Sequence, residues 1–391
     1  MNTISKKTLA VIFLLLIFIV GIGTGWNVWQ AETGFSKAEG FKDLKTKIEG
    51  QISSNFQNKY GWVSINGLFE RMMGVTVVRD PDYNVNKLTN GQIMYDLPER
   101  DMTKYAGYVE ELNDALTDMD IDLMYVQIPF KIKDDSYMPP GTHANGNENA
   151  DQMVQLLREK GIDTLDLRDD IKEQNLDWSS LFFNTDHHWT PQTAFWAAGV
   201  IMKRIQKDYG FSIDEDAYDE SNWKLKTYEN YMLGAIGRRT GVFYGGLDDF
   251  TLYDPKFKTD FTFWGSSKNG EDVREGDFWN SMYLWENMEK RADFEKNTYN
   301  TYLGKEYGLF EIQNHRSDNG LRILMIRESF SDALAPFIAV GADEVLGVDL
   351  RKYNKKSIPE LCEEYDIDLV MIDYNPSAFS KNQFDFFDRG W

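Results

Sequence analysis

The sequence predicts an α/β fold with a parallel central sheet, preceded by one transmembrane helix at the N-terminus. Short β-rich runs bounded by polar residues alternate with amphipathic runs of helical length, a spacing that is typical of parallel βαβ units. A long uncharged apolar run lies within the first thirty residues. The 391 residues are enough for one large domain, or two smaller ones, with a core.

The N-terminal segment has Lys6 and Lys7 before the apolar run and Trp26 and Trp29 after it. About 20 apolar residues span the roughly 30 Å of hydrocarbon in a bilayer, and lysines before the span favour a cytoplasmic N-terminus. We therefore expect residues 1–30 to be a cytoplasmic tip and an uncleaved single-pass anchor in the cell membrane, with the rest of the chain extracytoplasmic. A cleaved signal peptide is the alternative, although no small-x-small site follows the run directly.

The chain after the anchor divides into two parts. Residues 31–95 are charged and weakly periodic from Phe35 to Tyr60, which predicts a helical stalk and a lead-in segment. Residues 96–391 carry the strand and helix patterns of the main domain. The expected strands lie at residues 121–129, 161–168, 321–329, 343–351 and 366–375. Ligands of such sheets bind at the carboxyl ends of the strands, so the residues that close each strand are candidates for a site.

Residues from about 253 to 307 depart from this pattern and predict an aromatic insertion. Two interpretations are open: the rings form a small satellite core, or they are exposed and stack on sugar. The rings are those of Trp264, Trp279, Tyr283, Trp285, Tyr299 and Tyr302.

Net charge bears on which partners the protein can bind, and cysteine content bears on whether disulfide bonds stabilise it. A net charge of -21 argues against nucleic acid as a partner, because a net negative field repels phosphates. The single cysteine, Cys362, forms no internal disulfide, so the domain must be held together by its core. Cys362 falls in a helical pattern and is expected to be a packed small residue rather than a nucleophile.

Two of the four histidines stand side by side behind an aspartate in TDHHWTPQTAF, residues 185–195. Thr190 is a suitable cap and Pro191 a suitable first residue for a helix that runs to Gly210. The loop before that helix is therefore held firmly, while its side chains, Trp189 among them, are free to point into a cleft.

Three interpretations of Asp186, His187 and His188 compete. A metal site needs further ligands, and the sequence has no HExxH motif and no clustered cysteines, so a metal is the least favoured. The second interpretation is structural, with one histidine in the core and the other solvated. The third takes Asp186 and His188 as the acid and base of a triad, in which the carboxylate holds the imidazole in the tautomer that accepts a hydroxyl proton. The triad demands a serine elsewhere.

Ser329, in LRILMIRESFSDALAPFI, is the candidate for that serine. It falls between a buried-type strand and a helix, where backbone N–H groups and the positive end of the helix favour an oxyanion. The alternative is an ordinary helix cap. Ser331 is a second possible cap and a weaker nucleophile candidate.

Taken together, TDHHWT, GAIGRRTGVFYGGLDDF, ESFSDALAPF and DLVMIDYN resemble the bacterial DHHW protein family. That family is related to the SGNH-type polysaccharide O-acetyltransferases of the alginate acetylation machinery, which carry an Asp-x-His-Trp motif and a later serine. The resemblance extends from about Asp96 onward and includes a Pro-x-Lys segment at residues 129–131. It implies a three-layer SGNH hydrolase-like fold with a parallel sheet, circularly permuted because the Asp-x-His element precedes the serine.

The resemblance also implies roles for individual residues. Ser329 would be the nucleophile, His188 the general base and Asp186 the residue that orients it, with the backbone N–H of Ser329 as an oxyanion donor. Relatives usually have Gly-Asp before the serine, whereas this chain has Arg327 and Glu328, a replacement that crowds a tight turn. The candidates for substrate binding or oxyanion stabilisation are Arg239, Tyr244, Asn375, Lys131, His187 and Trp189.

The activity that the resemblance implies is extracytoplasmic O-acetylation of a cell-envelope or exported polysaccharide through an acyl-enzyme. A membrane-bound O-acyltransferase would supply the acetyl groups, and neither a metal nor a cofactor is implied. Two alternatives stay open. One is an extracytoplasmic carbohydrate acetylesterase with the same triad, and the other, which the Arg-Glu replacement keeps open, is a non-catalytic glycan-binding envelope protein.

Overall fold

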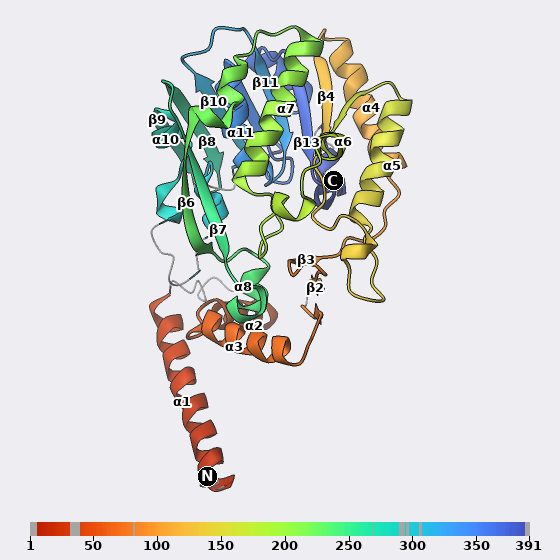
Figure 1. Ribbon diagram of the computed structural model, residues 1–391. Helices are drawn as coiled ribbons and strands as arrows, with labels where there is room; N and C mark the ends of the chain where they lie inside the picture. The colour runs from red at the N-terminus through yellow and green to blue at the C-terminus, as the bar shows by residue number, and fades with distance from the viewer. Residues whose placement is uncertain are drawn as a thin grey trace.

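An eight-stranded mixed sheet forms the centre of the main domain (Figure 1). The computed structural model describes residues 6–31, 40–80, 83–268, 270–288, 294, 297–304 and 307–387. The sheet order is β5-β4-β13-β11-β12-β10-β8-β9. The strands are β4 (Asp122–Gln127), β5 (Asp163–Asp166), β8 (Phe261–Ser267), β9 (Gly270–Gly276), β10 (Leu309–Asn314), β11 (Arg322–Arg327), β12 (Glu344–Val348) and β13 (Leu369–Tyr374).

The five strands predicted from the sequence are β4, β5, β11, β12 and β13, and they pair in parallel as expected. Their order in the sheet is β12-β11-β13-β4-β5. If β11, β12 and β13 are numbered 1 to 3 and the count continues with β4 and β5 as 4 and 5, this is the flavodoxin-like order 2-1-3-4-5. The central sheet is thus mostly parallel, as the sequence predicts. Strands β10, β8 and β9 extend one edge in antiparallel pairs, because a hairpin from the predicted insertion adds to the sheet.

Helices cover both faces of the parallel strands. Side chains of a strand alternate between faces, so Ile323 and Met325 of β11 belong to one core, and Leu324 and Ile326 belong to the other. The first core includes α6 (Leu167–Glu173), α7 (Pro191–Tyr209) and α11 (Ser331–Ile338), and the second includes α4 (Thr103–Thr117), α5 (Gly146–Glu159) and α12 (Ile358–Tyr365). The result is a three-layer α/β/α domain.

The predicted start of α7 is confirmed in detail. The side chain of Thr190 accepts a hydrogen bond from the backbone N–H of Thr193, Pro191 is the first helical residue, and Gly210 ends the helix with a φ of 81°. A positive φ of this size strains most side chains but not glycine. The DHH loop is therefore attached to a helix with both ends well defined.

The aromatic insertion is part of the main core rather than a satellite, and its tyrosines are not exposed. Tyr283, Tyr299 and Tyr302 are fully buried in the same core as α7 and α11, which contradicts the interpretation that these rings are free to stack on sugar. Trp279 and Trp285 are half-buried against that core. Part of the insertion, including residues 289–293, lies outside the described residues.

A hairpin of β6 (Trp223–Met232) and β7 (Asp248–Pro255) stands beside the main sheet, and two short helices, α8 (Gly237–Thr240) and α9 (Val242–Gly245), lie in its connection. These helices contact α3 (Lys59–Met72), and α2 (Phe41–Ser54) lies nearby (Figure 1). The predicted stalk is thus two helices, of which α3 packs on the domain; Phe35 lies outside the described residues.

The remaining N-terminal elements are a helix and a small sheet. Helix α1 (Lys6–Gln30) projects away from the domain (Figure 1), and its residues Ala10–Gln30 are long and apolar enough to cross a membrane. Strands β1 (Val77–Val78), β2 (Val85–Lys87) and β3 (Ile93–Tyr95) form an antiparallel sheet. This sheet lies between α3 and the loops at the carboxyl ends of the parallel strands.

Candidate active site

Ser329 lies in the turn between β11 and α11, and its hydroxyl faces a histidine instead of the helix. Its Oγ is 2.7 Å from Nε2 of His188 and 3.1 Å from Oε2 of Glu328. The interpretation of Ser329 as an ordinary cap is therefore wrong. A serine hydroxyl has one proton, so His188 and Glu328 are alternative acceptors for it.

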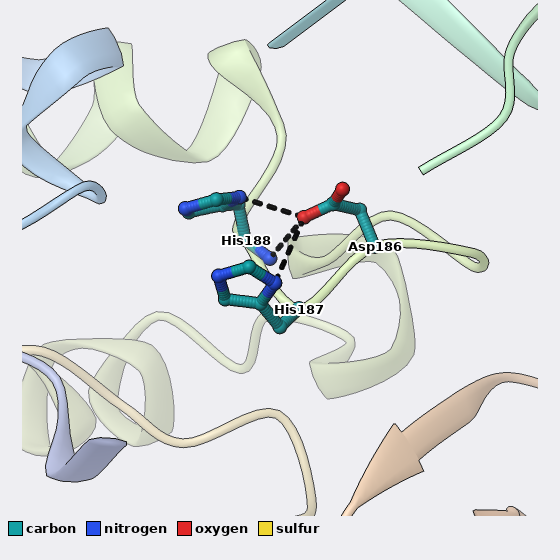
Figure 2. Close-up of side chains that lie close together, drawn as sticks. All are labelled: Asp186, His187 and His188. Carbon is teal, nitrogen blue, oxygen red and sulfur yellow. Dashed lines mark hydrogen bonds and ion pairs between the residues drawn. The ribbon is translucent and has the colours of Figure 1, made fainter. Parts of the chain in front are cut away.

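His188 is held from its other side by Asp186. Nδ1 of His188 lies 2.6 Å from Oδ1 of Asp186, which also accepts the backbone N–H of His188 at 3.1 Å. The second carboxylate oxygen, Oδ2, accepts the backbone N–H of Ala235 at 2.6 Å. Figure 2 shows Asp186, His187 and His188 drawn together around that carboxylate. With Nδ1–H donated to Asp186, Nε2 is the nitrogen that faces Ser329 and accepts its proton.

Asp186 is ionised in this arrangement. Burial by itself would raise its pKa, but the field of His188 and the hydrogen bonds from His188 and from the N–H of Ala235 hold the pKa well below the usual range. A buried carboxylate with these partners stabilises the imidazolium that forms when His188 takes a proton.

His187 lies against the same carboxylate but does not reach Ser329 through any contact in the described residues. Its Nδ1 is 3.3 Å from Oδ1 of Asp186, and its ring centroid is 3.8 Å from that of His188. Burial, followed by the field of His188, lowers the pKa of His187 to about 3. His187 is therefore neutral at physiological pH and lies between His188 and the ring of Tyr95.

Asp186, His187 and His188 also have the donor set of a metal site, with one ligand atom from each residue within 4.8 Å of the others. Oδ1 of Asp186 and Nδ1 of His188 nevertheless face each other at hydrogen-bond distance. Oδ1 of Asp186 accepts both the Nδ1–H and the backbone N–H of His188, so hydrogen bonds already occupy the oxygen that this set would offer to an ion.

The aromatic insertion supplies one wall of the site. The ring of Tyr299 stacks on His188 with centroids 3.9 Å apart and planes 7° from parallel. The Tyr299 hydroxyl and Nε1 of Trp189 each donate to the backbone carbonyl of Phe330, both at 3.1 Å. These two bonds hold the residue that follows Ser329. Trp189 is fully buried, so its prediction as a pocket-lining residue is corrected to a support for the turn.

Lys131 connects the DHH loop to the lead-in segment. Its buried Nζ donates to the carbonyl oxygens of Ile93, Asn184 and Asp186 at 2.9, 3.0 and 2.9 Å. Burial lowers the pKa of Lys131 to about 7, but three acceptors require all three protons of an ammonium group. The structure therefore corrects the prediction that Lys131 contacts substrate, since its donors are already used.

Replacing Lys131 with methionine is expected to lower the free energy of unfolding by about 3–5 kcal/mol, because removal of a buried charge leaves its partners unpaired. Urea unfolding of the full chain, followed by tryptophan fluorescence, measures the loss. Lys133→Met is the matched control, since Lys133 is exposed two residues further along. Equal stability of the two variants would show that the three hydrogen bonds do not hold the loop.

Two other predicted residues lie away from Ser329. The guanidinium of Arg239 pairs with Asp80 at 2.6 Å and covers the ring of Tyr83. The hydroxyl of Tyr244 donates to the carbonyl of Val75 at 2.9 Å. Both join the 237–245 segment to the lead-in segment, so the structure corrects their prediction as oxyanion donors.

Asn375 follows β13 and is fully buried. Its amide donates to the carbonyl of Pro129 at 2.7 Å, and its oxygen accepts the N–H and hydroxyl of Ser377. These contacts join two neighbouring strand ends next to the site, and none of them involves Ser329.

The unusual Arg327-Glu328 pair fits the turn. Arg327 is buried, and its guanidinium donates to Oδ1 of Asp332 at 2.5 Å, to the carbonyl of Tyr307 at 2.7 Å and to the carbonyl of Glu328 at 3.5 Å. It therefore braces β11 against the start of α11, and the expectation that it crowds the turn is wrong. Burial raises the pKa of Glu328 in spite of attraction from His188 and Arg351.

Sequence reasoning missed three contacts of the site: Glu328 on the hydroxyl of Ser329, the ring of Tyr299 on His188, and the N–H of Ala235 on Asp186. The sequence contained one signal for the contact between Ala235 and Asp186, namely the glycine before Ala235. Gly234 lies so close to the catalytic loop that an added Cβ would be 2.4 Å from Cβ of Asp186, so only glycine permits this approach. A glycine in GAIGRRTG therefore indicated a close backbone contact.

Two family models match the chain over the segments that build this site. Residues 91–246, which carry Asp186 and His188, match the SGNH hydrolase-like domain of acetyltransferase AlgX, and residues 174–348, which also carry Ser329, match the DHHW protein family. Over these residues the chain is similar to the DHHW proteins. The recognition made from TDHHWT and ESFSDALAPF is thereby confirmed.

Solved structures give the same result for the fold. Bacillus cereus PatB1, one of whose structures contains a sulfonyl adduct, is similar with a TM-score of 0.64 and 20% identity, over 80% of this chain and 99% of PatB1. A DHHW family protein from Eubacterium siraeum is similar with a TM-score of 0.60 and 18% identity, over 79% of this chain and 96% of the other. No curated protein sequence matches the chain. The SGNH-like fold class is confirmed.

Proposed function

We propose that this protein is an extracytoplasmic O-acetyltransferase that modifies a cell-envelope or exported polysaccharide through Ser329. The observation that carries the proposal is the continuous line from Asp186 through His188 to Ser329, with hydrogen bonds of 2.6 and 2.7 Å. The match to an acetyltransferase domain family supports acetyl as the group transferred. The span-length helix α1 supports attachment to a membrane.

In the first half of the reaction Ser329 becomes acylated. His188 Nε2 takes the hydroxyl proton while Ser329 Oγ attacks the carbonyl carbon of the acetyl donor, and the carbonyl oxygen becomes an oxyanion. The backbone N–H of Ser329 and the positive end of α11 favour that charge. As the oxyanion collapses, the bond to the donor breaks and the leaving group takes the proton from His188.

In the second half a sugar hydroxyl replaces the donor. His188 removes the proton of the hydroxyl, whose oxygen attacks the acetyl ester on Ser329, and collapse returns the proton from His188 to Ser329 Oγ. Asp186 stays ionised throughout and stabilises each imidazolium. The stacked ring of Tyr299 shields one face of His188 from water, which favours a sugar hydroxyl over water as the acceptor.

The nucleophile can be tested without knowing the natural substrate. A sulfonyl fluoride is expected to form a sulfonate ester with Ser329, with fluoride leaving and the hydroxyl proton passing to His188. Peptide mass spectrometry of the treated full chain locates the adduct. His188→Ala is expected to abolish labelling of Ser329. Labelling of a different residue, or an unchanged rate in His188→Ala, would contradict the proposed activation.

A carbohydrate acetylesterase with the same triad is the second candidate. In the final step His188 can deprotonate a water molecule as well as a sugar hydroxyl, and water would then release acetate. An activated acetyl ester offered with and without an oligosaccharide separates the two activities. An acetyltransferase forms acetylated oligosaccharide, whereas an esterase releases acetate at the same rate in both samples. A glycan-binding protein without catalysis would form neither acetylated oligosaccharide nor acetate.

A membrane-bound O-acyltransferase is the proposed supplier of acetyl groups in the cell.

A further inference from the structure

The exposed large apolar side chains of the described residues are concentrated in one part of the chain. Apart from α1, all but three of them lie between residues 41 and 73. They are Phe41, Ile48, Ile52, Phe56, Trp62, Ile65, Leu68, Phe69, Met72 and Met73. Scattered apolar residues on a surface need no explanation, but a continuous patch indicates an interaction site.

Helix α3 turns this patch away from the domain. With about 3.6 residues per turn, Ser64, Gly67 and Arg71 share one face. Oγ of Ser64 accepts the N–H of Val242, Gly67 lies directly against the carbonyl of Thr240, and Arg71 donates to the carbonyl of Phe243. This face of α3 is therefore packed on α8 and α9.

The opposite face of α3 carries Trp62, Ile65, Phe69, Met72 and Met73, with exposed fractions from 40% to 74%. A soluble helix with one packed face normally turns polar residues outward. Here the polar and small side chains contact the domain, and the large apolar side chains are left uncovered.

Helix α2 and the last turns of α1 continue the apolar surface. Ile48, Ile52 and Phe56, together with Trp62, line a groove whose other wall is the apolar side of α1 from Phe13 to Val28. Two polar contacts fasten this arrangement: the N–H of Gln57 donates to Oγ1 of Thr24, and Asn27 donates to the carbonyl of Asn55. These contacts lie in the same turns of α1 as Trp26 and Trp29, where an interfacial belt is expected.

Charge distinguishes this surface from the rest of the protein. Residues 41–73 contain five lysine or arginine side chains and three aspartate or glutamate side chains, whereas the whole chain has a net charge of -21. A locally cationic pair of amphipathic helices suits the headgroups of a membrane that contains anionic lipid. A second copy of the chain would be repelled by the high net negative charge of each protein.

We infer that α2 and α3 form a membrane-interface platform, in which the apolar face of α3 and the open groove beside α1 are covered by lipid. The occupant is a lipid bilayer, because the patch is continuous with a helix of spanning length and lies at its interfacial end. The platform, through its contacts with α8 and α9, would hold the domain against the membrane at a set height and orientation. This inference does not depend on the proposed acetyl transfer.

The test uses the full chain in nanodiscs of phosphatidylcholine and phosphatidylglycerol, one copy per disc. Phe69→Cys and Met72→Cys are labelled with a nitroxide, and Val273→Cys is the control, because Val273 is 57% exposed on β9 in the main domain. The native Cys362 is buried and its thiol pKa is raised by burial to about 12, so it does not compete for label. A native near-ultraviolet circular dichroism spectrum reports that each variant is folded.

Oxygen concentrates in lipid, whereas a nickel chelate stays in water. In nanodiscs, oxygen is therefore expected to relax the labels at positions 69 and 72 several times more strongly than the chelate does. At position 273 the chelate is expected to be the stronger relaxant. A further variant, Ile65→Cys, carries a nitroxide on the same face of α3. Adding Phe69→Asp and Met72→Asp to this variant is expected to move the label from lipid to water. Equal nickel access at positions 69 and 273 would overturn the inference. Shielding of position 69 from both reagents would also overturn it, because this result indicates a protein in place of lipid.

Discussion

Replacing Ser329 with alanine is expected to lower the rate of acetyl transfer by about 10⁴-fold or more, as removal of the nucleophile does in other serine triads. The Oγ atom that lies 2.7 Å from His188 is the only atom that the substitution removes. Binding and oxyanion stabilisation remain, so substrate affinity is expected to change little. Steady-state transfer to an oligosaccharide and sulfonyl labelling measure the loss.

Ser331→Ala is the matched control, since the sequence offered both serines. The hydroxyl of Ser331 is buried and donates to Oδ2 of Asp373. Its loss leaves a buried carboxyl group short of a donor, which is expected to cost about 1–3 kcal/mol of stability while transfer continues in the folded protein. If Ser329→Ala retained wild-type transfer, the proposed triad would have to be abandoned.

Replacing Asp186 with asparagine is expected to lower the transfer rate by about 10⁴-fold, because the amide selects the wrong tautomer of His188. Both carboxylate oxygens accept a backbone N–H, from Ala235 at Oδ2 over 2.6 Å and from His188 at Oδ1 over 3.1 Å. Because the bond at Oδ2 is the shorter one, the amide oxygen is expected to stay there. The NH₂ group then takes the Oδ1 position and donates to Nδ1 of His188. The ring must carry its proton on Nε2, where it can no longer accept one from Ser329.

Folding and the rate of serine labelling together check this explanation. Near-ultraviolet circular dichroism is expected to show a native fold for Asp186→Asn, while sulfonyl labelling of Ser329 slows in proportion to transfer. His187→Phe is the control beside it. The neutral His187 ring has no contact with Ser329 among the described residues, so this variant is expected to retain activity within about tenfold. A larger loss in His187→Phe than in Asp186→Asn would assign the base to His187.

The elements next to this site were predictable because their signals are local. Thr190 and Pro191 define the start of α7 through contacts with residues three or fewer positions away. The β-rich runs that became β4, β11 and β13 each contain their own burial pattern. The antiparallel edge was not predictable in the same way, because the partner of β10 depends on which strands remain unpaired after the parallel sheet forms.

Side chains with long-range partners were the source of the errors. Lys131 became a candidate for substrate binding through its place in the Pro-x-Lys segment that the chain shares with the family. It is instead buried by the lead-in segment, whose Ile93 carbonyl supplies one of its three acceptors. Arg239 and Tyr244 were misplaced for the same reason, since both are occupied by residues between 75 and 83.

The sequence by itself determined the α/β class, the spanning length of α1, the capped helix behind the DHH loop, and the choice of Ser329, His188 and Asp186 as candidates. Capping, periodicity and strand composition act between residues that are close along the chain, so a sequence displays them directly. Only the tertiary structure decided that His188 contacts a serine 141 positions away and that Tyr299 covers the imidazole. It also decided that Glu328 is a second acceptor for the hydroxyl proton of Ser329. Those contacts depend on which faces the packed core brings together, and that choice is made by the whole chain at once.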